Sequence, residues 1–571
     1  MKSWKEQLRG IKTALRGAGG NKKGGDKKPS AVEFEPPESW STGNRLIPKG
    51  GGGSRKDADS DRITPPKAND RNIASKHRSD PTSRNSDQRS TISGTVGSSD
   101  NKPSLRSDRA APPIFKPLVN GGSSLVMPEW SAAGRSLQHP EHQGERSPPM
   151  TVRVGVDFGT AFTKVAIRAG ADLVPVEWSE VTGDDSETGR YIVPGFVVRS
   201  PDGEYCWQRI KGSDIQGNLK LSVIKKAKSD ECPISTVAYL ALVIRYARAF
   251  LYRNTEVGRK LAGRSLRWEL NIGCPTEPHE KPEVVDMFRR IARTAWRLAT
   301  RINLQESDIK AAWVADESDT GLETEPGVVP EFVAHIAGYL ASPQVKEGLH
   351  ALIDIGAATL DVATFNVVLQ NEQTSPPRIP IFFSAVRPLG THYLHYNRHS
   401  KLDLELSWND AAPVESAGEF GERNGKASED VIAVDGEFAE QIERCVTGVI
   451  DGTRINSRGD PRSRAWREGL PIFVTGGGSS CDLYRQAMVA VEAELKLRVE
   501  KRSGSSRHFR FIELSPTFGS ARRIDTGGRL TVALGLTEDA ENIARVVPHR
   551  DIGPITYGTK ASVDHSDLYG D

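Results

Sequence analysis

Three short segments carry residues whose types and spacing suit the binding of a phosphorylated ligand. The first reads Asp-Phe-Gly-Thr-Ala-Phe-Thr-Lys over 157–164 and follows an apolar run that predicts a strand. A glycine turn of this kind exposes backbone N–H groups to phosphate oxygens, and Gly159 lets the backbone approach a ligand closely. The Thr160 hydroxyl adds a donor beside Ala161, and Asp157 offers a negative charge to a metal ion.

The second segment repeats this pattern later in the chain. It reads Ile-Asp-Ile-Gly-Ala-Ala-Thr-Leu-Asp-Val over 353–362, so an aspartate, a glycine turn and a threonine again stand between two apolar strands. Two such hairpins indicate a duplicated domain that closes over one nucleotide. Because carboxylates facing a polyphosphate require a hydrated divalent cation between them, Asp157 and Asp354 are expected to hold Mg²⁺ through water. The phosphate-binding residues expected in this turn are Gly356, Ala357, Ala358 and Thr359.

The third segment reads Thr-Gly-Gly-Gly-Ser-Ser over 475–480, between an expected strand at 471–474 and an expected helix at 482–499. A strand, a glycine turn and a helix N-terminus together let a nucleotide's phosphate or sugar approach the backbone. Alone, the segment also fits an ordinary tight turn, but its place after the two aspartate hairpins favours a binding role. The residues expected to contact the adenosine part are Gly476, Gly477, Gly478 and Ser479.

These three segments, in this order, resemble the phosphate-one, phosphate-two and adenosine motifs of the superfamily that contains actin, the sugar kinases and DnaK-type heat-shock proteins of the 70 family. The resemblance covers 152–540 and implies an α/β, two-lobed actin-like ATPase fold of the duplicated ribonuclease H type. We expect no chaperone substrate-binding domain, because the polar residues after Thr537 are too few to build one. Further segments that resemble the DnaK-type ATPase domain are 191–203, 218–226, 270–277, 330–339 and 529–536.

The resemblance also implies roles in phosphoryl transfer from ATP to water. The catalytic residues that it implies are Asp157, Glu331, Asp354, Asp361, Lys164 and Lys225. The phosphate-contacting lysine stays open, because Lys164 has the spacing of actin's lysine whereas Lys225 and Lys226 stand in the chaperone-like segment. Glu331 fits best as the acid that orients the attacking water together with Asp361, and Glu325 is the alternative.

The expected function is slow, Mg²⁺-dependent ATP hydrolysis by a chaperone-like domain whose lobe closure is read by a partner. Ala357 and Ala358 stand where the chaperones usually carry glycines, and alanine restricts the backbone. This departure favours an alternative, a nucleotide-binding switch or scaffold with little hydrolysis. A small-metabolite kinase is the second alternative, although the sequence shows neither a substrate-facing base nor an acceptor pocket.

The motifs lie in the second part of a chain whose composition is uneven. Residues 1–150 hold 26 Lys and Arg against 16 Asp and Glu, a net charge of +10, whereas the remainder has a net charge of −7. Trp4, Leu8, Ile11 and Leu15 recur at helical spacing among basic residues, which predicts an amphipathic helix at 1–17. The other expected regions are a disordered linker at 18–150, lobe one at 151–350 completed by 525–540, lobe two at 351–540 with an acidic surface insertion at 403–437, and a polar tail at 541–571.

Strands and helices alternate around the motifs, as in an α/β or mixed-sheet protein. Beyond the strands that flank the aspartates, strands are expected at 191–198 and 267–272. The helices expected before the third motif are 235–251, 283–300, 330–340 and 437–452.

Several classes of protein are disfavoured by the rest of the sequence. The five cysteines form no zinc or disulfide pattern, no apolar run approaches the length of a membrane span, and no secretory signal is expected, so we predict a cytoplasmic protein. His392, His395 and His399 share a helical face that could hold zinc, but no fourth ligand is evident. We expect a protein partner at the N-terminal helix or the lobes, peripheral contact with an anionic membrane as an alternative, and no sequence-specific nucleic acid.

Overall fold

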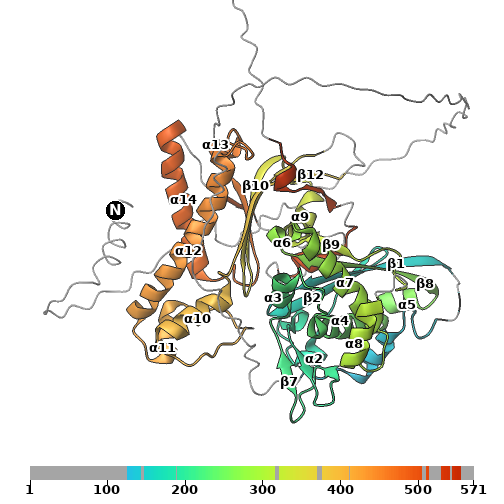
Figure 1. Cartoon of the computed structure of the whole chain (residues 1–571). Coiled ribbons are helices and arrows are strands. Elements are labelled where there is room, and N and C mark those ends of the chain that lie inside the picture. The colour runs from blue at the N-terminus through green and yellow to red at the C-terminus, as the bar shows by residue number, and fades with distance from the viewer. Residues whose placement is uncertain are drawn as a thin grey trace, which may run out of the picture. The chain divides into compact units, whose positions relative to one another are not determined.

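The computed structural model describes residues 125–553 (Figure 1), apart from residues 143, 145–146, 188, 316–319, 370–375, 411, 504–508, 513–528 and 540–542. All of them belong to one of the chain's two compact units, Ala110–Asp571. The predicted helix at 1–17, the predicted linker up to residue 124 and the tail after residue 553 lie outside the described residues. The described chain is a mixed α/β protein with two six-stranded sheets and a smaller sheet of three strands.

The first sheet is built around the first aspartate motif. Three strands form an antiparallel meander in chain order, and two later strands add parallel to β1. β1 ends in five consecutive buried residues, the pattern of a strand covered on both faces. In sheet order the strands are β3 (Asp172–Pro175), β2 (Phe162–Ala169), β1 (Ser147–Phe158), β8 (Arg264–Cys274) and β9 (Gly327–Pro330), with β4 (Val193–Pro194) beside β2.

The second sheet has the same order of strand directions around the second aspartate motif. β10, β11 and β12 form the antiparallel meander, and β13 and β14 add parallel beside β10. A sixth strand, β15, pairs parallel with β12. In sheet order the strands are β14 (Arg510–Ile512), β13 (Pro471–Thr475), β10 (Gly348–Ile355), β11 (Leu360–Val367), β12 (Arg378–Arg387) and β15 (Arg545–Val547), and the small sheet holds β6 (Tyr205–Cys206), β5 (Val197–Arg199) and β7 (Asp214–Gln216).

The predicted helices form at the expected places, although their bounds differ. They are α4 (Ile234–Arg253), α7 (Pro282–Leu298), α9 (Glu331–Leu340), α12 (Ser428–Ile455) and α14 (Asp482–Ser503). The helices α12 and α14 run along the second sheet (Figure 1). The remaining helices are η2 (Glu129–Arg135), α2 (Ser179–Thr182), η3 (Gly189–Tyr191), α3 (Leu219–Lys226), α5 (Val257–Leu261), α6 (Thr276–His279), α8 (Glu306–Ala315), α10 (Thr391–Lys401), α11 (Ala417–Asn424), α13 (Ala465–Glu468), α15 (Thr531–Gly535) and η4 (His549–Asp551).

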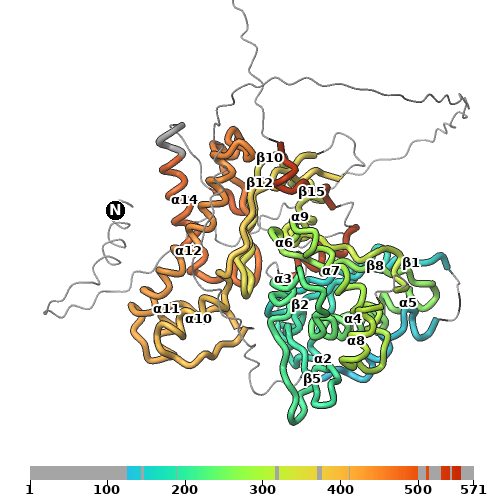
Figure 2. The backbone as a smooth tube through the Cα atoms, viewed as in Figure 1, coloured from blue at the N-terminus to red at the C-terminus, as the bar shows by residue number. Residues whose placement is uncertain are grey.

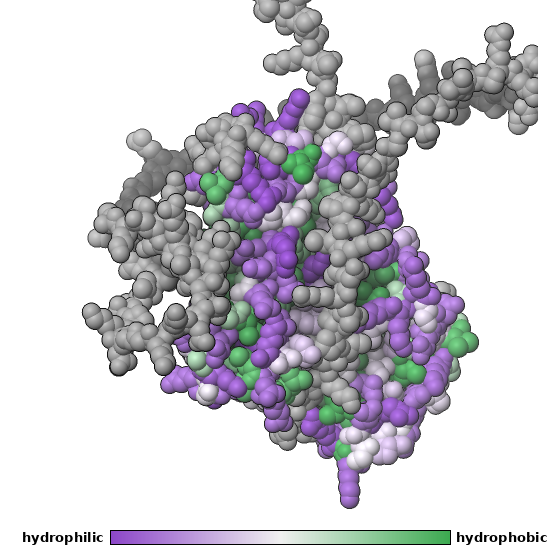
Figure 3. All heavy atoms as spheres, turned by 60° about the vertical axis from the view of Figure 1, so that its left-hand side comes forward, coloured by the Kyte–Doolittle hydropathy of each residue, from purple (hydrophilic) through white to green (hydrophobic). Residues whose placement is uncertain are grey.

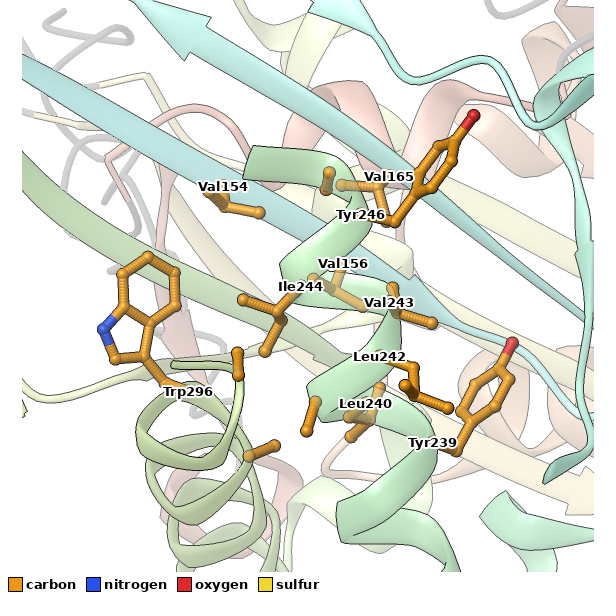
Figure 4. Close-up of a cluster of buried hydrophobic side chains, with 14 of the residues drawn as sticks. Val154, Val156, Val165, Tyr239, Leu240, Leu242, Val243, Ile244, Tyr246 and Trp296 are labelled. Atoms are coloured by element: carbon orange, nitrogen blue, oxygen red, sulfur yellow. The ribbon is translucent and has the colours of Figure 1, made fainter. Parts of the chain in front are cut away.

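Helix α4 forms the centre of the first sheet's core. Figure 4 shows its side chains, among them Leu240 and Ile244, packed toward Val154 and Val156 of β1 and toward Trp296 of α7. By length and composition α4 could cross a membrane, with a mean hydropathy of 1.4, although no such run was expected from the sequence. Of this stretch 83% is buried inside the protein, as in the core helix of a soluble protein.

A separate apolar cluster joins the helices α9 and α15 to strands of the second sheet. It includes Phe332 of α9, Leu534 of α15 and Phe473 of β13, and Figure 2 shows α9 next to β10 and β12. The helices α9 and α15 cross so closely that a Cβ on Gly535 would overlap the carbonyl oxygen of Ala334. This crossing therefore fixes α9 and α15 relative to each other.

The predicted linker ends earlier than expected, because residues 125–142 pack on the first sheet. The Gln138 side chain binds both the N–H and the carbonyl of Leu266 in β8, at 2.8 and 3.2 Å. Trp130 lies 4.9 Å from Tyr246 between ring centroids. Composition did not reveal this segment, because its few apolar residues show no periodicity and their partners are distant in sequence.

Two other regions, predicted as a surface insertion and a polar tail, contain helices and a strand. The acidic insertion expected at 403–437 contains α11 and the first turns of α12, where Asp435 forms a paired ion bridge with the buried Arg398 at 2.7 and 2.8 Å. The tail expected at 541–571 contributes β15, and Arg550 donates to the carbonyl of Glu280 at 2.9 Å. In both regions a few residues contact the rest of the folded chain, and the mostly polar composition does not reveal them.

The described surface carries no concentration of apolar residues that stands out in the view of Figure 3, where hydrophobic side chains appear as separate patches among hydrophilic ones. The most exposed large hydrophobic side chains are Val314 and Ile302. Scattered exposure of this kind is normal for a folded surface.

We predict that Gly134→Ala destabilises the full-length protein by about 1–3 kcal/mol, because the added Cβ would overlap the backbone carbonyl of Arg245 in α4. Urea unfolding measures the change. Glu129→Ala, an exposed position in the same short helix, serves as the control and should leave stability unchanged. Equal stability of the two variants would show that residues 125–142 do not pack on α4.

Candidate functional site

The two aspartate motifs form the same hairpin, one in each of the two six-stranded sheets. Asp157 in β1 pairs in register with Lys164 in β2, and Asp354 in β10 pairs in register with Asp361 in β11. The two turns between them are equally long, so Lys164 stands where the second hairpin carries an aspartate. The Lys164 ammonium donates to Asp157 Oδ2 at 2.8 Å. One hairpin therefore presents an ion pair and the other presents two carboxylates.

Helix α10 orients the peptide groups in the turn of the second hairpin. Backbone N–H groups at its start donate to carbonyl oxygens of the turn in three pairs, Gly390 to Ala358, Thr391 to Gly356 and His392 to Ala357, at 3.2, 3.2 and 2.8 Å. In a trans peptide the carbonyl of one residue and the N–H of the next point in opposite directions. The N–H groups of Ala357, Ala358 and Thr359 thus point away from α10, and no described residue accepts a hydrogen bond from them. Such a set of N–H groups makes an anion-binding concavity.

The alanines in this turn cause no backbone strain. Asn218 and Asp403 are the described non-glycine residues with positive φ, so Ala357 and Ala358 have ordinary backbone angles. Ala358 packs in the apolar cluster of the second sheet. The position that requires glycine is Gly390, where a Cβ would overlap the carbonyl oxygen of Ala357.

The turn of the first hairpin is held by two glycines. A Cβ on Gly159 would overlap the carbonyl oxygen of Phe162, which explains the glycine in the motif. The N–H of Gly195, before β5, donates to the carbonyl of Ala161 at 2.7 Å. Within the described chain the N–H groups of Thr160 and Ala161 make no hydrogen bond, so they are available to a ligand.

The glycine turn after β13 lies directly against the second hairpin. Gly476 has φ +87°, and a Cβ there would overlap Asp354 Oδ1. The N–H of Gly478 donates to the carbonyl of Ile355 at 2.9 Å, and a Cβ on Gly478 would overlap the Ile355 side chain. Gly477 differs from both, because it is exposed and a Cβ there would meet no atom within 4 Å. Gly477 is therefore the glycine of this turn that leaves space for a ligand.

The lysine that α3 buries is not one of those expected from the sequence. Lys220 is buried and its Nζ pairs with Oε1 of the buried Glu331. Lys225 and Lys226 are exposed, and Lys226 pairs with Glu231 at 3.2 Å. Residues five positions apart do not share a helix face, so Lys220 and Lys225 cannot both face the site. Burial, which a nine-residue segment rich in lysine does not reveal, distinguishes them.

Glu331 is the acid that the structure places among the predicted site residues. It begins α9 directly after β9, and the absence of a side chain at Gly273 makes room for it, since a Cβ there would lie 3.0 Å from Glu331 Cγ. The alternative, Glu325, has a half-exposed side chain 3.7 Å from Arg293. Of the two, Glu331 is the one that shares buried surroundings with Lys220.

Asp361 faces the site from the second hairpin and is only partly satisfied. Its Oδ2 accepts the backbone N–H of Thr276, at the start of α6, at 3.1 Å. Its Oδ1 is buried and finds no hydrogen-bond partner among the described residues. A buried carboxylate oxygen without a donor needs water or a cation.

Burial raises the pKa of two of these acids. Burial and the charges of Asp354 and Glu331 raise the pKa of Asp361 to about 7, against the opposing effect of the Thr276 hydrogen bond. Burial and the charge of Asp157 likewise raise the pKa of Glu331, although Lys220 opposes the change.

Neighbouring groups in the site also shift the pKa values of Lys220 and Asp354. Burial alone would lower the pKa of Lys220, but the charges of Glu331 and Asp157 outweigh it and raise that pKa. Burial alone would raise the pKa of Asp354, but His335, Lys164 and Lys220 outweigh it and lower that pKa.

Negative charge thus exceeds positive charge in this region. The carboxylates are Asp157, Asp354, Asp361 and Glu331, and the ammonium groups are Lys164 and Lys220. A divalent cation would reduce the excess and would suit the oxygen donors of this set. The residues present therefore fit the Mg²⁺ that the motifs predict.

The histidines of α10 are arranged for packing. His395 stacks on Trp408 with ring centroids 5.6 Å apart, and burial lowers its pKa to about 3. His392 Nε2 lies 2.6 Å from Asp410 Oδ1, and His399 Nδ1 lies 2.8 Å from the carbonyl of His395. In the described part of the chain no three His, Cys, Asp or Glu side chains are placed to ligate a metal ion directly.

Comparison with known proteins leaves the site to be interpreted from its geometry. No protein-family model matches the chain, and no curated protein matches its sequence. Among solved structures, the chain aligns with the ethanolamine utilization protein EutJ from Carboxydothermus hydrogenoformans at 14% identity. The alignment covers 70% of this chain and 93% of that one, with a TM-score of 0.28. The class of the protein, mixed α/β with two aspartate hairpins, follows from strand order and register.

We predict that Asp361→Asn makes the protein more stable than wild type above pH 7. The folded protein keeps a proton on Asp361 up to pH about 7, whereas the unfolded chain releases it near its ordinary value of 3.8. The stability that this group contributes is therefore complete below pH about 4 and is lost as the pH rises toward 7. The neutral amide retains it, and three pKa units correspond to about 4 kcal/mol.

Urea unfolding of both proteins at pH 4 to 8 measures this difference. Asp286→Asn is the control, because its side chain is largely exposed, and its stability should follow wild type at every pH. A constant difference between Asp361→Asn and wild type across this range would contradict the raised pKa of Asp361.

Proposed function

We propose that this chain binds ATP with Mg²⁺ between its two aspartate hairpins and hydrolyses it slowly, on a duplicated actin-like ATPase fold. The observation that carries the proposal is the turn of the second hairpin. Its carbonyls are taken up by α10, so its N–H groups at Ala357, Ala358 and Thr359 are left for an anion. The equal strand order of the two sheets and the matching register of the two hairpins support the duplication.

The phosphates would lie between the two turns. The N–H groups of Thr160 and Ala161 offer donors from the first hairpin, and Thr359 adds a hydroxyl from the second. The N-terminus of α10 adds a favourable dipole behind the second turn. Lys164 and Lys220 are the ammonium groups that pair with carboxylates of this site, and Lys164 would have to leave Asp157 to reach a phosphate.

Asp157 and Asp354 would hold Mg²⁺ through water, and the ion would neutralise phosphate charge. In the chain itself, Asp361 has the pKa of a group that can take a proton near neutral pH. Thr276 fixes Oδ2 of this carboxylate and leaves Oδ1 without a partner. Oδ1 of Asp361, together with Glu331, is therefore suited to orient a water molecule and to accept its proton.

Chaperone-like output through a partner belongs to the same proposal and rests on the motifs. A nucleotide-binding switch with little hydrolysis is the alternative that a test must separate from an ATPase. The ion pair between Lys164 and Asp157 favours the switch, because Asp157 already has a cationic partner. The ordinary backbone angles of Ala357 and Ala358 remove one reason for preferring that switch. Calorimetry with ATP and phosphate release from ATP answer the two questions separately.

We predict that Gly477→Val weakens ATP binding at least tenfold without lowering the unfolding temperature. A side chain there meets no protein atom and would instead occupy the space expected for the adenosine part. Gly263→Val is the matched control, because Gly263 lies in the turn between α5 and β8 and a Cβ there also meets nothing within 4 Å. Equal affinity of the two variants in calorimetry would remove the turn after β13 from the nucleotide site.

We predict that Asp354→Asn lowers ATP turnover by on the order of a hundredfold or more, because it weakens the hold on the metal ion. Glu331→Gln should lower turnover while ATP affinity stays close to wild type. Glutamine is preferred to alanine here, because removal of Glu331 would leave the buried Lys220 without a partner.

Phosphate release and calorimetry on the same preparations measure both effects. Glu325→Gln is the control for Glu331→Gln, since Glu325 is exposed and outside the site. A wild-type protein that binds ATP but releases no more phosphate than Asp354→Asn would contradict the ATPase and favour the switch.

A further inference from the structure

A buried histidine lies where the second hairpin, the glycine turn and helix α15 meet. His335 is 6% exposed and stands one helical turn after Glu331 on α9. Its neighbours come from β10, β13 and α15, three elements far apart in the sequence. No part of the proposed chemistry uses it directly, although its two ring nitrogens contact side chains from all three elements.

Hydrogen bonds connect this imidazole to Asp354 through a threonine. Nδ1 lies 2.8 Å from the hydroxyl of Thr531, and Nε2 lies 3.3 Å from the hydroxyl of Thr475. The Thr475 hydroxyl in turn lies 3.2 Å from Asp354 Oδ1. His335 Nε2 is 3.7 Å from the other carboxylate oxygen, Oδ2, which is beyond hydrogen-bond distance.

The donor and the acceptor of each of these hydrogen bonds follow from the chemistry of the groups. An ionised carboxylate only accepts, so the Thr475 hydroxyl must donate its proton to Asp354. That hydroxyl then accepts from Nε2–H of His335, and in the neutral imidazole Nδ1 accepts from the hydroxyl of Thr531. All three hydrogen bonds therefore point the same way, from α15 toward the carboxylate.

The packing around the histidine holds these hydrogen-bonded side chains in place. The residue before it, Ala334, is where α9 touches Gly535 of α15 at its closest approach. The residue after Thr475 is Gly476, whose missing side chain lets the turn lie against Asp354. A rotation of Asp354 would thus disturb the glycine turn, the histidine and the α9–α15 crossing together.

We propose that His335 is a positioning residue that holds the Asp354 carboxylate in the orientation required for the Mg²⁺–nucleotide complex. This inference rests on the proposed function, because it assigns Asp354 to that complex. Removal of a group that orients a carboxylate at a metal site typically lowers metal affinity by about 10- to 100-fold. The histidine also links Asp354 to the glycine turn after β13 and to α15, so the positions of both depend on the orientation of the carboxylate.

The test compares two buried histidines in the full-length protein. His335→Phe removes the hydrogen bonds to Thr531 and Thr475. His350→Phe is the matched control, because His350 is also fully buried, lies on β10, and bonds through both ring nitrogens to Tyr339 and Gly348 at 3.0 and 2.8 Å. Calorimetry of ATP binding at stepped Mg²⁺ concentrations, with unfolding temperatures alongside, gives two independent measurements for each variant.

We expect both variants to lower the unfolding temperature, and only His335→Phe to raise the Mg²⁺ concentration for half-maximal ATP binding, by about tenfold. His335→Gln should restore most of that loss, since an amide can donate to Thr475 and accept from Thr531. Equal Mg²⁺ requirements in His335→Phe and His350→Phe, or no rescue by glutamine, would overturn the positioning role alone. ATP binding by wild type that does not depend on Mg²⁺ would overturn the proposed function and this inference together.

Discussion

An excess of buried negative charge is the constraint on which the rest of the site depends. Four carboxylates and two ammonium groups share the region where the two hairpins, α3, α6 and α9 meet. Isolated carboxylates cannot be buried without partners, so each is held by a specific group. Lys164 holds Asp157, and Lys220 holds Glu331. The N–H of Thr276 holds Asp361, and the hydroxyl of Thr475 holds Asp354. The hairpins and helices are arranged so that these partners are within reach.

The polarity of one turn shows how helices can prepare a site without contributing side chains. Backbone N–H groups at the start of α10 occupy the carbonyl oxygens of the turn after β10, and the geometry of the peptide bond directs the remaining N–H groups away. No glycine is needed at Ala357 or Ala358, since both adopt ordinary backbone angles. The residue that makes the arrangement sterically allowed is Gly390, more than thirty positions away. The chemistry of a phosphate-binding turn is therefore only partly contained in the turn's own residues.

The parts of the site that the sequence predicts are those set by local rules. An apolar strand, an aspartate and a glycine turn predict a hairpin, and both hairpins form with the aspartates in equivalent register. Helices with clear periodicity, such as α4 and α7, form at the expected places. That the two hairpins bind ATP and Mg²⁺ stays a prediction.

The parts that the sequence does not predict depend on partners distant along the chain. Lys220 and Lys225 stand in one short helix with similar surroundings in sequence, and only burial beside Glu331 separates them. His335 has its partners in β13 and α15, so no local pattern identifies it. The sequence places residues 125–142 in the linker, because their anchors, Gln138 among them, bind a strand more than a hundred positions later.

The short strand β15 has a consequence for how the folded chain meets other copies of itself. An open sheet edge presents unpaired backbone N–H and carbonyl groups, which can recruit a strand from a second molecule. β15 pairs with β12 at Arg378–Pro380, and Arg550 then ties the following residues to the carbonyl of Glu280. The segment that composition marks as a polar tail therefore covers the start of the β12 edge, and a chain ending before Arg545 would leave Arg378–Pro380 open to intermolecular strand addition.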